Sequence, residues 1–180
     1  MKKTILITVL LLAASVNMHA QLLQIGVKAG LNYANFTNAT IQTDAITSYH
    51  AGLVAELKLM DKFAIQPELL YSTIGASYKN AGDEFKKELG YIAIPVLAKI
   101  YLGNSFSLEL GPQASFLLSE RGDFDATDAN TFDFALAGGL GLKVTKNIFL
   151  QGRYVLGLTE VSQNAEAKNS VLQFSAGLMF

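Results

Sequence analysis

The chain has 180 residues, of which 51% are hydrophobic and only 16% are charged, and it contains no cysteine. Soluble domains carry about 25% charged residues, so this composition is unusual for one, and the lack of cysteine excludes a disulfide framework and lipid attachment at a cysteine. Lys and Arg together number 14 against 15 Asp and Glu. The chain therefore lacks the basic surplus of a nucleic-acid-binding protein, and we expect no nucleic-acid partner.

Residues 1–20 have the organisation of a secretory signal peptide. Two lysines lie near the start, a short apolar run follows from Ile5 to Ala14, and polar residues separate that run from Ala20. The export machinery recognises this order of charge, apolar core and small residue. We predict cleavage after Ala20, which leaves residues 21–180 as a single domain.

The rest of the chain consists of segments in which every second residue is apolar. A period of two is the pattern of a β-strand whose two faces meet different surroundings. No part of residues 21–180 has the unbroken apolar run of a membrane-spanning helix. The pattern predicts strands over residues 24–33, 49–59, 63–72, 91–102, 106–118, 132–144, 148–159 and 171–180.

Short and long connections alternate between these strands. Short turns are predicted at residues 60–62, 103–105 and 145–147, and long polar loops at residues 37–47, 79–87, 120–130 and 160–169. A barrel that starts and ends on the periplasmic side needs this alternation. The fold class predicted is therefore all-β, an eight-stranded antiparallel up-and-down transmembrane β-barrel with a filled polar lumen.

The two faces of the predicted strands differ in charge. The outward positions carry none, whereas the inward positions hold Lys28, Glu56, Lys58, Glu68, Lys99, Glu109, Lys143 and Arg153. If the faces were reversed, each Lys or Arg near the middle of the bilayer would destabilise the folded barrel by about 2–4 kcal/mol. Because side chains just fill an eight-stranded barrel, we expect these residues to form a structural polar network, with a narrow ion pathway as the alternative. Inward glycines are expected to make room for them.

Aromatic and proline residues add two further expectations. Aromatic girdles are predicted on the long-loop side at Tyr33, Phe36, Tyr49, Tyr71, Tyr91, Phe116 and Phe132, and on the short-turn side at Phe63, Phe106 and Phe180. Proline removes a donor from the hydrogen-bond ladder. We therefore expect bulges or distorted pairing at Pro67, Pro95 and Pro112.

Several segments share a further pattern, which is carried by residues 91–99 (YIAIPVLAK), 110–112 (LGP), 115–118 (SFLL), 138–141 (GGLG) and 153–159 (RYVLGLT). Together they resemble the PorT-like family of outer-membrane β-barrel proteins. The resemblance implies a barrel in the outer membrane of a Gram-negative envelope, with proline tolerated in its strands. Its partners would be outer-membrane lipid and, during biogenesis, the barrel-assembly machinery. It brings no catalytic residues with it.

The sequence offers no convincing catalytic, cofactor or metal site. His50 is the only histidine outside the predicted signal peptide, and no serine and carboxylate are seen to converge on it. Asp123, Asp125 and Asp128 have a spacing that could hold calcium, but the segment lacks the glycine and distal glutamate of an EF-hand loop. We therefore predict no enzyme activity, no cofactor and no metal.

The predicted function is that of a non-enzymatic outer-membrane barrel with a structural role or with loops that bind an extracellular or periplasmic partner. Three alternatives remain. An accessory role in protein secretion is implied by the family resemblance alone. A lipid-modifying barrel enzyme would need a polar triad on the outer wall. A soluble ligand-binding barrel would need an apolar lumen and a charged exterior, the reverse of this pattern.

Overall fold

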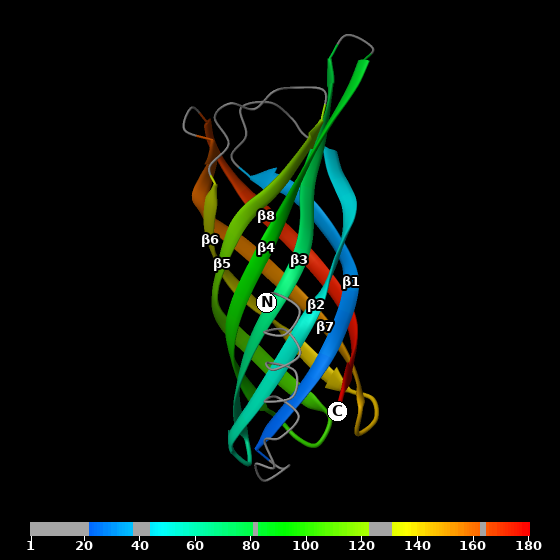
Figure 1. Cartoon of the computed structure of the whole chain (residues 1–180), viewed down its shortest axis with the longest axis vertical. Helices are drawn as coiled ribbons and strands as arrows, with labels where there is room; N and C mark the ends of the chain where they lie inside the picture. The colour runs from blue at the N-terminus through cyan, green and yellow to red at the C-terminus, as the bar shows by residue number, and fades with distance from the viewer. Residues whose placement is uncertain (1–21, 38–43, 81–82, 123–130, 163–164) are drawn as a thin grey trace, which may run out of the picture.

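The alternating segments form eight β-strands that close into one antiparallel barrel (Figure 1). The structure is a computed structural model, and it describes residues 22–37, 44–80, 83–122, 131–162 and 165–180. Its strands are β1 (Leu23–Thr37), β2 (Asp44–Met60), β3 (Phe63–Asn80), β4 (Asp83–Tyr101), β5 (Phe106–Gly122), β6 (Phe132–Lys143), β7 (Ile148–Ser162) and β8 (Ala165–Met179). No helix in these ranges is long and apolar enough to cross a membrane. The predicted signal peptide lies outside the described residues.

The first and last strands close the barrel. β1 pairs with β8 from Gly26 opposite Met179 to Thr37 opposite Lys168, and the amide of Phe180 donates a 2.8 Å hydrogen bond to the carbonyl of Ile25. Each strand therefore has a neighbour on both sides. Closure of this kind is what a sheet needs in hydrocarbon, where no water can satisfy an unpaired backbone group.

The strands are longer than the sequence pattern predicted on the long-loop side. β3 continues to Asn80 and β4 begins at Asp83, so most of the loop predicted over residues 79–87 is a paired hairpin that extends past the other strands (Figure 1). The loops predicted over 37–47, 120–130 and 160–169 are shortened in the same way. Polar residues predominate in these parts of the sequence, which obscures the apolar alternation although the backbone pairing continues. A search for a period of two therefore ends each strand too early.

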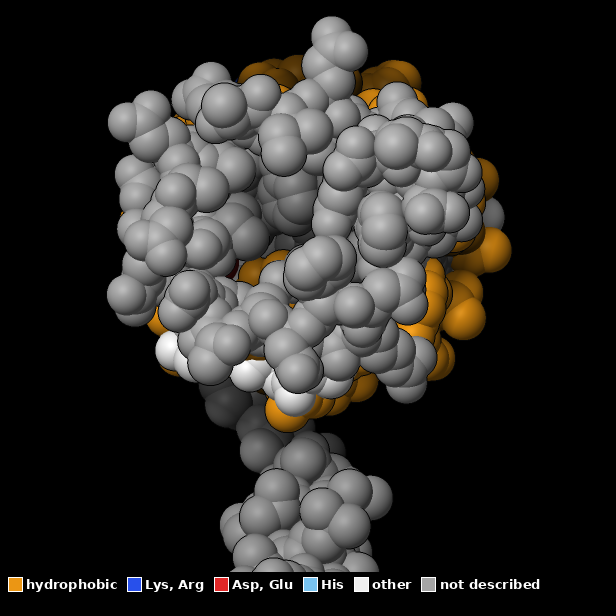
Figure 2. Space-filling view, turned by 90° about the horizontal axis from the view of Figure 1, so that it is seen from above, with side chains coloured by type: hydrophobic (Ala, Val, Ile, Leu, Met, Phe, Trp, Pro, Cys, Tyr) orange, Lys and Arg blue, Asp and Glu red, His pale blue; other side chains and the backbone are white. Residues whose placement is uncertain are grey.

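The predicted inward and outward faces are confirmed. Large apolar side chains on the outer wall are exposed, among them Leu57 (37%), Leu31 (59%) and Phe174 (59%), while most of the alternate positions are buried. Figure 2 looks down on the long-loop end and shows hydrophobic side chains around the outer rim. An apolar surface that encircles the whole barrel far exceeds the patches that soluble monomers expose. The outer wall is therefore suited to lipid.

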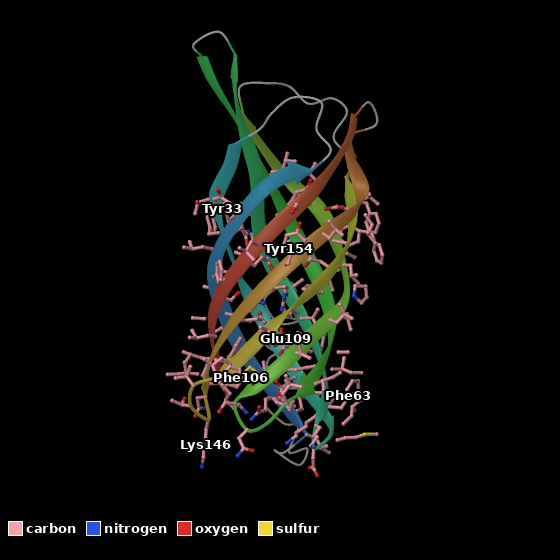
Figure 3. All side chains as sticks on the ribbon, turned by 180° about the vertical axis from the view of Figure 1, so that it is seen from behind. Tyr33, Phe63, Phe106, Glu109, Lys146 and Tyr154 are labelled. Atoms are coloured by element: carbon pink, nitrogen blue, oxygen red, sulfur yellow. The ribbon has the colours of Figure 1, made fainter. Side chains whose placement is uncertain are left out.

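Aromatic residues mark both ends of the apolar wall (Figure 3). On the long-loop side the ring centroids of Phe116 and Phe132 are 5.4 Å apart, and those of Tyr49 and Tyr71 are 6.3 Å apart. Phe106 on the short-turn side is exposed. The prediction was wrong for Tyr91, which is only 2% exposed, because its inward parity places it in the lumen. The side chain of Phe36 lies outside the described residues.

The prolines interrupt the pairing, as expected, but they do not produce the expected bulges, because the strand register is unchanged across them. The pairs on either side of each proline keep one register, but pairs are missing beside them. The β2–β3 ladder is interrupted around Pro67, and the β4–β5 ladder is interrupted after Pro95 and opposite Pro112. A proline removes one donor but adds no residue to its strand, so the ladder can lose a bond without slipping. A shift does occur where β2 gains a residue between Ala45 and His50. It lies near Ser72 and Thr73, which are adjacent in sequence and both buried.

Leu110 provides a test of the lipid-facing wall, because it lies on β5 between the aromatic residues Phe106 and Phe116. We expect Leu110→Arg to destabilise the folded barrel by about 2–4 kcal/mol, since the guanidinium would enter the middle of the bilayer. Leu110→Phe, which keeps this position apolar, should fold nearly as well as the wild type. Urea titration of the protein in lipid vesicles measures both changes. Equal stability of the two variants would contradict the assignment of this face to lipid.

Candidate functional site

A carboxylate from β3 lies at the centre of the lumen. Glu68 Oε2 is 2.9 Å from Lys28 Nζ, and the two carboxylate oxygens accept hydrogen bonds of 2.8 and 2.9 Å from the guanidinium of Arg153. Gln66, two residues earlier on the same inward face, donates a 2.7 Å hydrogen bond to Glu68 Oε1. The bidentate arrangement matches the planar guanidinium to the planar carboxylate, which makes it one of the stronger ion-pair geometries.

The ion pairs continue toward the short-turn end. Arg153 Nη2 is 3.5 Å from Glu109 Oε2, and Glu109 Oε1 is 3.6 Å from Lys99 Nζ. Lys99 is in turn 2.9 Å from Glu56 Oε2, and the Tyr101 hydroxyl donates a hydrogen bond to the other oxygen of Glu56. Figure 3 shows Glu109 in the interior between the two ends of the barrel. Three cations and three anions thus alternate, and their charges cancel.

Two glutamines cross-link this series, which we call the lumen network (Lys28, Glu56, Glu68, Lys99, Glu109 and Arg153). Lys28 donates a 2.7 Å hydrogen bond to Gln151 Oε1, and Gln151 Nε2 donates to Glu109. Gln66 Oε1 accepts a 3.0 Å hydrogen bond from Lys99. An amide can donate and accept at once, so each glutamine joins a cation to an anion. The sequence prediction missed both, although their inward parity could have pointed to them.

Burial makes this pairing necessary. Lys28 and Arg153 are 2% exposed, Glu109 is 3% and Glu68 is 4%. Removing a charge from water costs several kcal/mol, which a partner offsets only at good geometry. A few polar atoms of the lumen, such as Arg153 Nε, have no hydrogen-bond partner among the described residues. The lumen network is therefore tightly constrained, and a change to one member affects the others.

Two of the eight residues predicted for the network lie outside it. Lys58 and Lys143 are partly buried, and neither forms an ion pair in the part of the chain that the structure describes. The ammonium of Lys58 lies 5.9 Å from the centre of the Tyr101 ring. Both lysines are on the correct face, but they line a cavity at the short-turn mouth, and no carboxylate of the described residues lies within ion-pair distance of them. The alternation of residues along a strand therefore predicted which side of the wall each lysine lies on, but not its position along the barrel axis.

His50 forms a second polar cluster on the long-loop side of the network. Its Nδ1 lies 2.7 Å from Asn32 Oδ1, which also accepts a hydrogen bond from Gln173, and its Nε2 lies 2.7 Å from the Ser175 hydroxyl. Asn32 Oδ1 can only accept, so Nδ1 carries the proton and Nε2 accepts from Ser175. The register explains the cluster, because Gly30 pairs with His50 on one side and with Ser175 on the other.

Gly30 is needed there for space. A Cβ at this position would lie 2.7 Å from His50 Cε1 and 2.8 Å from His50 Nε2. Gly141 similarly makes room for Glu109, since its Cβ would lie 2.7 Å from Glu109 Oε1. The prediction that inward glycines accommodate long side chains is confirmed at both positions.

The Ser175, His50 and Asn32 contacts have the order of a nucleophile, a base and an orienting group. The sequence did not reveal this, because the three residues come from three strands that only the barrel register brings together. Each is buried, with exposures of 7%, 1% and 0%. Acyl transfer needs space for a reacting atom about 3 Å from the hydroxyl. A hollow that Ser175 helps to line lies on the apolar outer wall, against Leu140 and Phe174, whereas the Ser175 hydroxyl faces His50 in the lumen.

An apolar cluster occupies part of the lumen toward the long loops. It consists of Leu89, Tyr91, Leu97, Ala135, Ala137, Val155 and Val171, with Leu117 packed against it. Val155 lies two residues beyond Arg153 on β7, so the cluster follows the network directly. The apolar cluster and the hydrogen-bonded His50 cluster thus share this part of the lumen, and both fill it with side chains. Such filling argues against the narrow ion pathway.

The short-turn end is hollow instead. A polar cavity of about 450 Å³, which we call the vestibule, is lined by Gln24, Glu56, Lys58, Asp61, Tyr101, Gly103, Asn104 and Lys143. A second cavity of about 390 Å³ adjoins it at the turn between β6 and β7. Both lie at the opposite end from the apolar cluster. Within the described residues, no group of three or more His, Cys, Asp or Glu side chains could hold a metal ion, and the aspartates at 123, 125 and 128 lie outside those residues.

Comparison with known proteins agrees with this architecture. The family model described as "Outer membrane protein beta-barrel domain" matches residues 19–163. The comparison with curated protein sequences gave no match.

Three solved structures have a similar fold. The attachment invasion locus protein Ail of Yersinia pestis has a TM-score of 0.56 at 11% identity, over 87% of this chain and 98% of its own. OprG from Pseudomonas aeruginosa has a TM-score of 0.54 at 12% identity, covering 87% and 95%. Neisserial surface protein A has a TM-score of 0.53 at 13% identity, covering 88% and 97%. At these identities the likeness concerns the fold alone, and none of the three comparisons identifies the PorT-like family.

Glu68 provides a test of the lumen network. Glu68→Gln removes the carboxylate shared by Lys28 and Arg153, and we expect a loss of about 3–5 kcal/mol because two buried cations lose their main partner. Asp61→Asn removes an acidic group from the exposed turn between β2 and β3 and should change stability by less than about 0.5 kcal/mol. Urea titration in vesicles, followed by tyrosine fluorescence, compares them. Similar values for both variants would show that the network contributes little to stability.

Proposed function

Because the chain belongs to the outer membrane protein β-barrel domain family, we propose that it is a non-enzymatic outer-membrane scaffold that binds a surface partner through its long-loop end. The observation that carries this proposal is the filled lumen. The lumen network and the apolar cluster fill the interior of the barrel, so the two ends of the barrel are the places where a partner could bind. Loops on a rigid scaffold commonly carry specificity, because the scaffold fixes their positions.

The β3–β4 hairpin is the element best placed for such contact. It reaches beyond the other strands, and its register sets Lys79 opposite Glu84 and Tyr78 opposite Phe85 (Figure 1). A paired hairpin loses less conformational freedom on binding than an unstructured loop of the same length would. Ail, which shares the fold, was also solved in complex with the heparin analogue sucrose octasulfate. That complex suggests heparin as a first probe for this chain.

Trimming the hairpin tests the proposal. Replacement of residues 77–86 by Asn-Gly would join Ala76 to Lys87, which are paired in the barrel, through a two-residue turn that favours hairpins. We expect cells with the trimmed protein to adhere to heparin-coated surfaces several-fold less than cells with the full protein. The trimmed protein should still show the heat-dependent gel mobility of a closed barrel. Equal adherence of cells with full, trimmed or no protein would contradict binding through this hairpin.

A lipid-modifying enzyme is the competing function, and Ser175 is its one candidate nucleophile. We expect no labelling of the folded protein by a fluorophosphonate, because the Ser175 hydroxyl faces the closed lumen and already donates to His50. Ser175→Ala is the control for labelling at any other serine. Labelling of the wild type that disappears in Ser175→Ala would contradict a non-enzymatic role.

A further inference from the structure

We propose that the vestibule at the short-turn mouth is a binding site for a phosphate group, held between Lys58 and Lys143. This site is separate from the long-loop end and does not depend on the role proposed there. It would open to the aqueous space on the periplasmic side. The charges of the neighbouring lumen network cancel, so the positive charges of the two vestibule lysines are not neutralised by that network.

The charge balance of the vestibule is the first argument. Glu56 also lines the cavity, but it is already paired with Lys99 and hydrogen-bonded to Tyr101. Lys58, Lys143 and Asp61 are what remain, two cations against one anion. Two ammonium groups that line one partly enclosed cavity repel each other, so an anion between them would relieve a cost that the free protein bears.

The unused hydrogen-bond donors are the second argument. Gln24 and Asn104 also line the vestibule, and among the described residues the side-chain amide of neither forms a hydrogen bond. This is unlike the lumen network, where almost every polar atom is engaged. Two amides and two ammonium groups together offer several donors to one oxygen-rich anion. Phosphate accepts such bonds on every oxygen, and lysine commonly binds it as a point charge.

Asp61 refines the choice of anion. A carboxylate in the cavity disfavours an anion that can only accept hydrogen bonds, but a phosphate that keeps a proton can donate one to it. The volume of about 450 Å³ lies within the range of small-molecule sites and leaves room for a group attached to the phosphate. The ligand is therefore either free phosphate or a small organic phosphate, and these two sources share one recognition chemistry.

The experiment is a titration of the folded, isotope-labelled protein in a non-ionic, phosphate-free detergent, followed by backbone amide shifts. Inorganic phosphate and glycerol 3-phosphate are added separately, with sodium chloride at matched ionic strength as the reference. We expect saturable shifts at Lys58, Asn104 and Lys143 with both phosphates. Equal affinity assigns the site to the phosphate group itself, and tighter binding of glycerol 3-phosphate assigns it to an organic phosphate.

Lys58→Gln and Lys143→Gln should each weaken binding about tenfold or more, since each removes a charged donor. Lys62→Gln is the matched control, because Lys62 lies on the adjacent turn and does not line the vestibule; its affinity should stay within about twofold of the wild type. A phosphate-dependent rise in the urea midpoint of the wild type provides a readout that needs no variant. Shifts that fail to saturate, that chloride reproduces, or that Lys62→Gln reduces equally would overturn the proposal.

Discussion

Every charge that the barrel wall buries in the middle of the lumen must have a counter-charge there, because lipid surrounds the wall and little water reaches this depth. Glu68 meets this constraint for two cations at once, with Lys28 on one side and the Arg153 guanidinium on the other. The alternation then extends through Glu109 and Lys99 to Glu56. Removing any one of these groups would leave another uncompensated at low dielectric. The inward face of each strand, and with it the register of the barrel, is constrained by this matching.

The same constraint divides the barrel into three zones along its axis. The middle zone holds charges that cancel, and the zone toward the long loops holds the apolar cluster beside the polar His50 cluster. The short-turn mouth is open and carries surplus positive charge. A plugged middle rigidifies the wall without offering a route through it. The two ends can then act independently, one as a presenting surface formed by extended strands and the other as an enclosed polar cavity. This separation is consistent with a scaffold whose specificity lies in its ends.

Most of the fold could be predicted from the sequence, because a lipid-facing wall enforces a period of two that remains readable in every strand. Two kinds of information were not readable. The first was the position of a side chain along the barrel axis. Lys58 and Lys143 point inward like Lys99, yet only Lys99 forms ion pairs with the carboxylates of the network. Register was the other: Asn32, His50 and Ser175 are far apart in sequence, and only the pairing of β1 with both β2 and β8 brings them together. The ends of the strands were missed where polar residues predominate in the sequence.

The long reach of the lumen network also governs the order in which the barrel can assemble. Lys28 and Gln151 are 123 positions apart in the chain, and Glu68 and Arg153 are 85 apart. Neither contact can form until strands from both halves of the chain have come together, so an unclosed sheet holds these charges unmatched and must keep them hydrated. Water therefore has to leave the interior late, after β1 has met β8. Topologies dominated by such distant contacts fold slowly. Loss of water as the final step would also make the closed barrel slow to unfold, because opening it would separate the buried ion pairs.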